Sequence, residues 1–155
     1  MNGFKINNKG SGKVFSNPVL DRLTRTHFAI PVVLYYSVGA LTIGYAVYSP
    51  EISLVKYFWL FPAGMFLFSF VEYLIHRFVF HFKAETETAR EVQYKIHGIH
   101  HEYPRDKDRL VMPPLMSMLL ASFLLLLFLF SLGENGWLLF GGFMSGYSSY
   151  LMIHY

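Results

Sequence analysis

The chain has 155 residues, of which 54% are hydrophobic and 19% aromatic, and its formal net charge is +3. This length corresponds to one domain, and the apolar content is too high for an ordinary soluble domain. No cysteine is present, which excludes disulfides and thiolate metal ligands. The basic residues flank apolar stretches, so their distribution favours a membrane protein and argues against nucleic-acid binding.

A polar, basic lead occupies residues 1–26 and lacks the apolar core of a signal peptide. Within it, residues 19–26 are expected to form a short helix on the membrane surface. Four apolar stretches follow, and about 20 apolar residues suffice to cross a bilayer as a helix. We expect these spans at about residues 27–48, 57–75, 115–132 and 137–155. The predicted fold is all-α: a single membrane domain, residues 1–155, with four transmembrane helices.

The lysines and arginines lie almost entirely on one side of this arrangement. Five of them precede the first span and seven lie between the second and third, which leaves only Lys56 on the other side. The positive-inside rule makes the basic side cytoplasmic, and four spans place both termini there. The intervening segment, residues 76–114, is rich in histidine and is predicted to form a cytoplasmic helical cap.

Histidines are concentrated in that segment in the patterns H-x4-H and H-x2-H-H. Its five histidines are His76, His81, His97, His100 and His101. Imidazole clusters of this kind indicate a transition metal such as zinc, iron, copper or nickel. On a helix, His97 and His101 share one face with His100 beside them. His76 and His81 are about 140° apart on an ideal helix, so the helix should distort or end near Phe80, or the pair serves two metals.

Acidic residues beside the histidines are candidates for orienting the ligands. Glu72 precedes His76 by four residues, where a carboxylate can hold a metal-binding imidazole, although it could simply be an interfacial acid. Asp106 and Asp108 could orient histidines or Arg109, or could serve as loop and cap residues.

Two further stretches carry local predictions. Residues 82–95 are typical of an exposed helix that Thr86 or Thr88 could cap. Near the end of the chain, Tyr150 and His154 fall on one helical face, which makes His154 a sixth candidate ligand and Tyr150 a candidate neighbour of the site. His27 is interpreted as an interfacial histidine without a metal role.

The two histidine patterns together resemble the fatty acid hydroxylase superfamily, which includes sterol desaturases and C-4 methyl oxidases. The following run HH-x2-P-x-D-x2-RLVMPP, residues 100–114, resembles the fatty acid and sphingolipid 2-hydroxylase branch. The last stretch, GYSSYLMIHY, resembles a family segment that ends in H-x3-H, of which only His154 is present. A further downstream H-x2-HH cluster is absent. The chain is therefore expected to be C-terminally incomplete, or a divergent member with an incomplete site.

The resemblance implies a membrane-bound, dioxygen-dependent di-iron hydroxylase that acts at carbon 2 of a long-chain fatty acid or sphingolipid acyl chain. Its implied metal ligands are the five clustered histidines and His154. Zinc lacks redox chemistry but could occupy such a site in a structure. The electrons would come from a separate donor, of cytochrome b5 or ferredoxin type with a reductase. The bacterial inner membrane is favoured over the endoplasmic reticulum because no electron-transfer domain is fused to the chain.

Two alternative functions remain open. One is a sterol-type oxidase or desaturase of the same superfamily, and the other is a catalytically incomplete metal-binding membrane protein. A carrier would place ionisable residues in the middle of its spans, and these spans are almost free of them.

Overall fold

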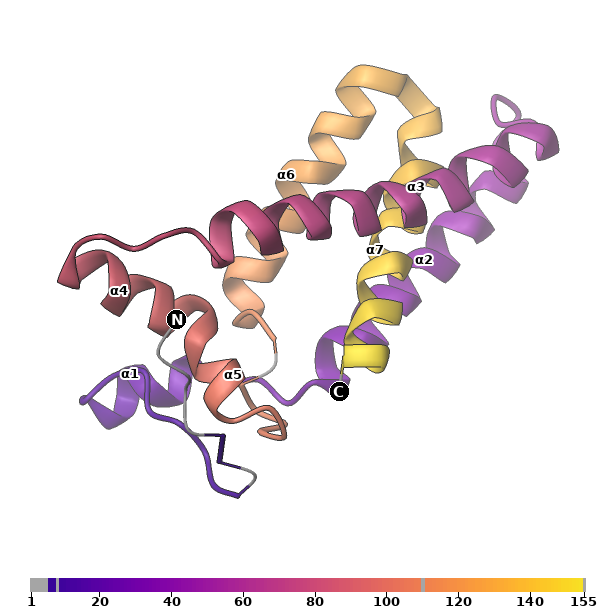
Figure 1. The fold of residues 1–155 in the computed structure, drawn as a ribbon. Helices are drawn as coiled ribbons and strands as arrows, with labels where there is room; N and C mark the ends of the chain where they lie inside the picture. The colour runs from indigo at the N-terminus through magenta and orange to yellow at the C-terminus, as the bar shows by residue number, and fades with distance from the viewer. Residues whose placement is uncertain (1–5, 8, 110, 155) are drawn as a thin grey trace. The chain divides into compact units, whose positions relative to one another are not determined.

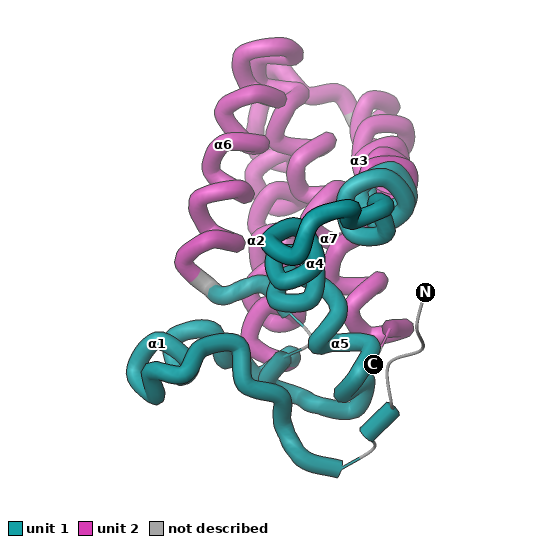
Figure 2. Tube along the Cα trace, turned by 60° about the vertical axis from the view of Figure 1, so that its left-hand side comes forward, with its two compact units in different colours: residues 1–28, 72–113, 155 teal, residues 29–71, 114–154 magenta. Residues whose placement is uncertain are grey.

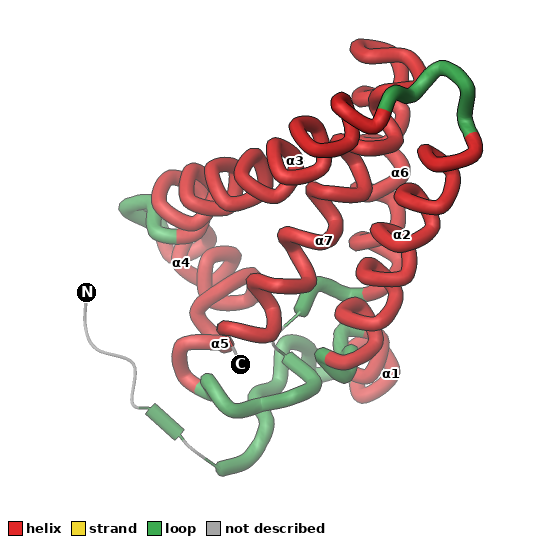
Figure 3. Tube along the Cα trace, turned by 90° about the vertical axis from the view of Figure 1, so that its right-hand side faces the viewer, coloured by secondary structure: helices red, strands yellow, loops and turns green. Residues whose placement is uncertain are grey.

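The computed structural model describes residues 6–7, 9–109 and 111–154. In this part of the chain every regular element is helical and no strand occurs, as the sequence predicts (Figure 3). The chain divides into two compact units, each of which packs mainly within itself (Figure 2). Unit 1 comprises residues 1–28, 72–113 and 155, and unit 2 comprises residues 29–71 and 114–154.

The helices of Figure 1 follow one another along the chain with short connections. Their bounds are α1 Pro18–Leu23, α2 Ala29–Tyr48, α3 Leu54–Ile75, the π-helix η1 His76–Phe80, α4 Glu87–Gln93, the π-helix η2 Tyr94–Gly98, α5 Ile99–Glu102, α6 Pro114–Leu132, the 3₁₀ turn η3 Gly133–Asn135, and α7 Gly136–His154. The helix expected over residues 19–26 is present in part as α1, which ends at Leu23, and Pro18 occupies its favoured place in the first turn.

Among the residues that the structure describes, three helical stretches are long and apolar enough to cross a membrane: Ala29–Tyr48, Val55–Phe80 and Leu115–His154. The last has 40 residues and contains both α6 and α7. Between these two helices the backbone turns at η3, where Gly133 has φ +57°, a conformation that glycine adopts without steric cost. The chain reverses there, so α6 and α7 form a helical hairpin (Figure 1).

Helix α7 lies at the centre of unit 2, because its glycines let neighbouring helices approach closely. A Cβ on Gly142 would lie 2.0 Å from the Phe61 carbonyl oxygen of α3, and one on Gly141 would lie 1.8 Å from Thr42 Oγ1 of α2. Small residues at helix interfaces have this effect in membrane proteins. Around them the aromatic rings of Phe68 and Phe143 meet edge to face at 5.3 Å, which fills the core between α3 and α7.

The outer surface of unit 2 is apolar as well. Leu41, Phe66 and Phe130 are 72%, 76% and 90% exposed, respectively. Soluble proteins rarely expose continuous apolar surface of this kind, whereas helices in lipid do so routinely. Both the core and the exterior of unit 2 therefore fit a bilayer environment.

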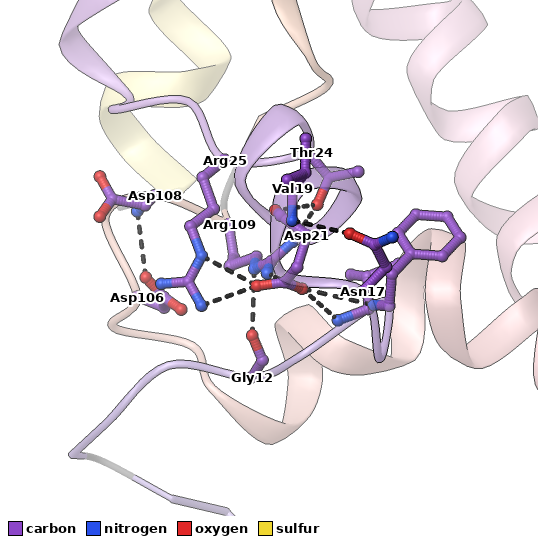
Figure 4. A network of polar contacts seen from close by, with 11 residues as sticks. Gly12, Asn17, Val19, Asp21, Thr24, Arg25, Asp106, Asp108 and Arg109 are labelled. Atoms are coloured by element: carbon purple, nitrogen blue, oxygen red, sulfur yellow. Dashed lines mark hydrogen bonds and ion pairs between the residues drawn. The ribbon is translucent and has the colours of Figure 1, made fainter.

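Unit 1 is organised around a buried arginine in the segment that follows the histidines (Figure 4). The Arg109 side chain is 2% exposed, and its Nη2 lies 2.5 Å from Asp21 Oδ1 on α1. The same guanidinium donates hydrogen bonds to the Gly12 carbonyl oxygen and to Thr24 Oγ1. Asp21 also accepts bonds from the Val14 amide and from Arg25. This network joins the basic lead to the loop at residues 106–109.

The environment of Asp21 strongly favours its ionised form. Burial alone would raise its pKa, but hydrogen bonds from Val14, Arg25 and Arg109 outweigh burial and hold the pKa of this carboxyl well below its usual range. A carboxyl whose pKa is lowered by folding stabilises the protein above the ordinary aspartate pKa of about 4, and this contribution is lost as the pH falls towards the folded-state value.

We predict that Asp21→Asn destabilises the protein by about 3 kcal/mol at pH 7, because it leaves a buried guanidinium without its counter-charge. The melting temperatures of the parent and the variant should converge as the pH is lowered below about 4. Thermal unfolding in detergent over a pH series measures this difference. Glu91→Gln is the control: it removes the partner of Lys95 in an exposed ion pair, so the melting temperature should change little. If the difference in melting temperature between Asp21→Asn and the parent did not change with pH, the proposed role of the Asp21 charge would be wrong.

Candidate metal centre

A change of helical period brings the first two histidines together. After Ile75 the chain continues as the π-helix η1, which the His81 amide closes with a 3.1 Å bond to the His76 carbonyl. A π-turn places residues five apart in register, whereas an α-helix does not. The Nε2 atoms of His76 and His81 consequently lie 3.0 Å apart. The prediction that the helix distorts and ends near Phe80 is confirmed.

The second pair is carried by the segment that begins at α4. The Thr86 side chain accepts a hydrogen bond from the Ala89 amide and caps α4. Thr86 is one of the two residues that the sequence offered as the cap. The chain then passes through η2 into α5, and the Nε2 atoms of His97 and His101 lie 2.8 Å apart. Their predicted common face is confirmed. His100 lies beside them, its ring 6.1 Å from that of His97.

The two pairs meet within unit 1. One ring nitrogen from each of His76, His81, His97 and His101 lies within 4.8 Å of all the others. Metal–nitrogen bonds of about 2.1 Å place two ligand nitrogens about 3.4 Å apart at a tetrahedral zinc ion, and about 3 Å or about 4.2 Å apart at an octahedral ion. The observed separations are of this order, and neutral imidazoles are suitable donors for zinc, copper, iron or nickel. The four side chains therefore fit a transition-metal ion.

Neighbouring groups hold these rings in place. The Phe80 ring stacks on His97 at 4.7 Å with an interplanar angle of 15°. Glu72 Oε1 lies 3.7 Å from Nδ1 of His76, on the side of the ring opposite the nitrogen that faces His81. That distance is longer than a hydrogen bond, yet the arrangement is the one in which carboxylates orient metal-binding imidazoles.

His97 is the buried member of the four and is electrostatically prepared to bind a metal. Burial, followed by repulsion from the imidazoles of His101, His76, His81 and His100, lowers its pKa to about 3. It is therefore neutral at pH 7. Because a metal binds the deprotonated ring, no proton has to be displaced from His97.

A cavity of about 1120 Å³ on unit 1 adjoins three of the four histidines. His81, His97 and His101 form part of its wall, together with polar side chains that include Lys83 and Arg90. The histidine group is thus accessible from a pocket that has both apolar and charged walls.

Gln93 connects the two histidine pairs and was not recognised in the sequence. Its Nε2 donates hydrogen bonds to the carbonyl oxygens of Phe80 and Phe82, at 2.9 and 2.8 Å. These carbonyls flank His81, while Gln93 itself ends α4, four residues before His97. Glutamine is common on exposed helices, so its position in one sequence carries no signal of this contact.

The remaining predicted site residues have contacts of their own. His154 ends α7 in unit 2, and its ring stacks on Tyr150 at 5.0 Å. Asp106 Oδ1 accepts a hydrogen bond from the Asp108 amide. This contact matches one of the two predicted alternatives for these aspartates, that they are loop and cap residues. The arginine beside them, Arg109, pairs with Asp21 instead of either aspartate.

We predict that His97→Ala or His101→Ala removes the bound transition metal from the purified protein, because each change takes away one of four converging nitrogens. Metal content by plasma mass spectrometry measures the effect. His27→Ala serves as the control and should retain the metal, since His27 lies outside the group of four. Unchanged metal content in both site variants would refute the ligand assignment.

We also predict that Gln93→Leu weakens metal binding by about 10- to 100-fold, the usual effect of losing a group that orients the ligands. The variant keeps all four histidines but frees the carbonyls beside His81. Competition between the protein and a chelator for cobalt, followed by visible absorption, measures the affinity. Thr88→Ala on the exposed part of α4 is the control. Equal affinity in Gln93→Leu and the parent would show that Gln93 does not position the site.

Comparison with known proteins identifies the family. The model of the family described as fatty acid hydroxylase matches residues 61–155. Fatty acid 2-hydroxylase of Mus musculus is 34% identical over 81% of this chain and 38% of its own length. Dihydroceramide fatty acyl 2-hydroxylase FAH1 of Arabidopsis thaliana is 41% identical over 59% of this chain and 39% of its own length. The chain thus spans about 40% of these relatives.

A solved structure supports the same assignment. The structure of full-length scs7p, in which only the hydroxylase domain is visible, has a TM-score of 0.79 and 33% identity, and the match covers 94% of this chain and 56% of that one. The curated relatives named above are a mammalian and a plant protein, which counts against the preference for a bacterial membrane. The histidine spacing, the all-helical fold and these similarities lead to one conclusion: the chain belongs to the fatty acid hydroxylase family.

Proposed function

We propose that this chain is part of a membrane-bound enzyme that hydroxylates carbon 2 of a long acyl chain, either free or within a sphingolipid. The observation that carries the proposal is the convergence of four imidazole nitrogens within 4.8 Å at the wall of an accessible cavity. Relatives named fatty acid 2-hydroxylase and ceramide very long chain fatty acid hydroxylase supply the substrate class.

The proposed cofactor is iron, held by His76, His81, His97 and His101. Iron supplies, when bound, the activation of dioxygen that no side chain can perform, with electrons from a separate cytochrome b5- or ferredoxin-type donor. A second iron would need further ligands, for which His100 and His154 are the candidates in this chain. His100 is proposed because its ring lies 6.1 Å from that of His97, and His154 because the last stretch of the chain resembles the family segment that ends in H-x3-H.

The chain's own residues would prepare this site in three ways. Burial keeps His97 neutral, and stacking on Phe80 restricts its ring to one orientation. Glu72 faces the outer nitrogen of His76, which favours the tautomer whose other nitrogen is free to bind. The cavity wall formed by His81, His97 and His101 leaves room for the carbonyl end of an acyl chain, which lies directly beside carbon 2.

We further propose four membrane crossings, with both termini and the histidine-bearing segment on the cytoplasmic side. Helices α6 and α7 have 19 residues each, and at 1.5 Å per residue each is about 28 Å long, close to the hydrocarbon thickness of a bilayer. The 40-residue apolar stretch would then cross twice, with its turn at η3. The positive-inside rule supports the orientation.

We expect the iron-loaded protein, supplied with dioxygen and a reduced donor, to convert a long-chain acyl substrate into its 2-hydroxy product, detected by mass spectrometry. His81→Ala should form no product because it removes a ligand at the cavity wall, and His27→Ala should remain active. An oxidised sterol as the product would favour the sterol-type alternative. A protein that binds iron stoichiometrically but forms neither product would favour a metal-binding protein without catalysis.

A further inference from the structure

Helix α1 buries Asp21 and leaves its apolar side chains exposed. Asp21 is buried against Arg109, whereas Val19, Leu20 and Leu23 are 67%, 48% and 68% exposed. A surface helix in water does the opposite and buries its apolar stripe against the core. The outward face of α1 is therefore suited to an apolar surrounding.

The chain connectivity limits how far this face can lie from a bilayer. Five residues, 24–28, separate α1 from α2, the first apolar stretch, so Leu23 and Ala29 can be at most about 20 Å apart. Backbone hydrogen bonds of 2.9 Å also join the Thr26 and Phe28 amides to the carbonyls of Asp108 and Lys107. That loop precedes the apolar stretch that begins at Leu115. The segment around α1 is thus tied to the starts of two membrane-compatible stretches.

Charged residues around α1 suit a lipid surface. Lys9, Lys13 and Arg22 are exposed, and they lie in the lead or on α1 itself. Helices that lie in the membrane interface combine apolar side chains, which enter the boundary between headgroups and acyl chains, with cations that meet anionic headgroups. Both components are present here.

We propose that α1 is an interfacial anchor whose residues Val19, Leu20 and Leu23 insert into the lipid surface, with Arg22 and the lead lysines facing anionic headgroups. Because Asp21 is bound to Arg109, insertion would also hold the loop at residues 106–109 at that surface. The inference rests on the membrane insertion of the apolar stretches and is independent of hydroxylation, so it can fail or succeed separately from the proposed activity.

The absence of cysteine in the chain permits a direct test. Single variants Leu20→Cys and Leu23→Cys are labelled with a nitroxide in full-length protein reconstituted into bilayers that contain anionic lipid. Electron paramagnetic resonance then compares the accessibility of each label to oxygen, which concentrates in lipid, and to a polar nickel complex, which concentrates in water. Leu41→Cys in α2 calibrates the lipid signal and Glu87→Cys on exposed α4 calibrates the aqueous signal.

Labels at residues 20 and 23 should be more accessible to oxygen than to nickel, as at residue 41 and opposite to residue 87. Nickel accessibility equal to that at residue 87 would overturn the proposal, because the face would then lie in water. Immobile labels that neither reagent reaches would also overturn it, because another protein surface would then cover α1. The melting temperature of each labelled variant, compared with the parent, verifies that the label has not unfolded unit 1.

Discussion

One π-helical turn is the constraint on which the first histidine pair of the candidate metal centre depends. This turn, η1, brings His76 and His81 to a separation of 3.0 Å although they are five residues apart. His97 and His101 are four residues apart, a spacing that an ordinary helix also brings to one face, and they lie 2.8 Å apart. Regular α-helices would direct His76 and His81 to different sides. Turns of the π type are rare and occur preferentially at functional sites. Here the local change of period brings the two histidines of the first motif together.

Gathering four imidazoles has an electrostatic cost that a bound cation would remove. Protonation of His97 is opposed by burial and then by the neighbouring imidazoles, which together lower its pKa to about 3. Neutral rings avoid the repulsion but leave several acceptor nitrogens close together, which a metal ion would satisfy. Metal binding and the folding of unit 1 are therefore expected to be coupled, as in other proteins whose ligands are poorly arranged without the ion.

Periodicity and composition sufficed to predict the helical class and the apolar stretches, because both depend on residues close in sequence. For the same reason they gave the distortion near Phe80 as one of two alternatives and Thr86 as one of two possible caps. The common face of His97 and His101 followed from the same local geometry. Gln93 could not be predicted, since its role comes from carbonyl groups 11 and 13 residues away that any sequence could supply. The partner of Arg109 was also missed, because Asp21 lies 88 residues earlier in the chain, on α1.

Arg109 shows how a motif residue can serve the site indirectly. It belongs to the RLVMPP run that resembles the 2-hydroxylase branch, and two acidic residues precede it closely in sequence. The structure instead directs its guanidinium towards Asp21, Thr24 and Gly12 in the lead. A guanidinium with several fixed donors is suited to join separate segments in a single geometry, which a lysine could not reproduce. The arginine thus fixes the end of the histidine-bearing segment to α1, and the branch-specific run has a structural role in unit 1 whether or not it contacts a substrate.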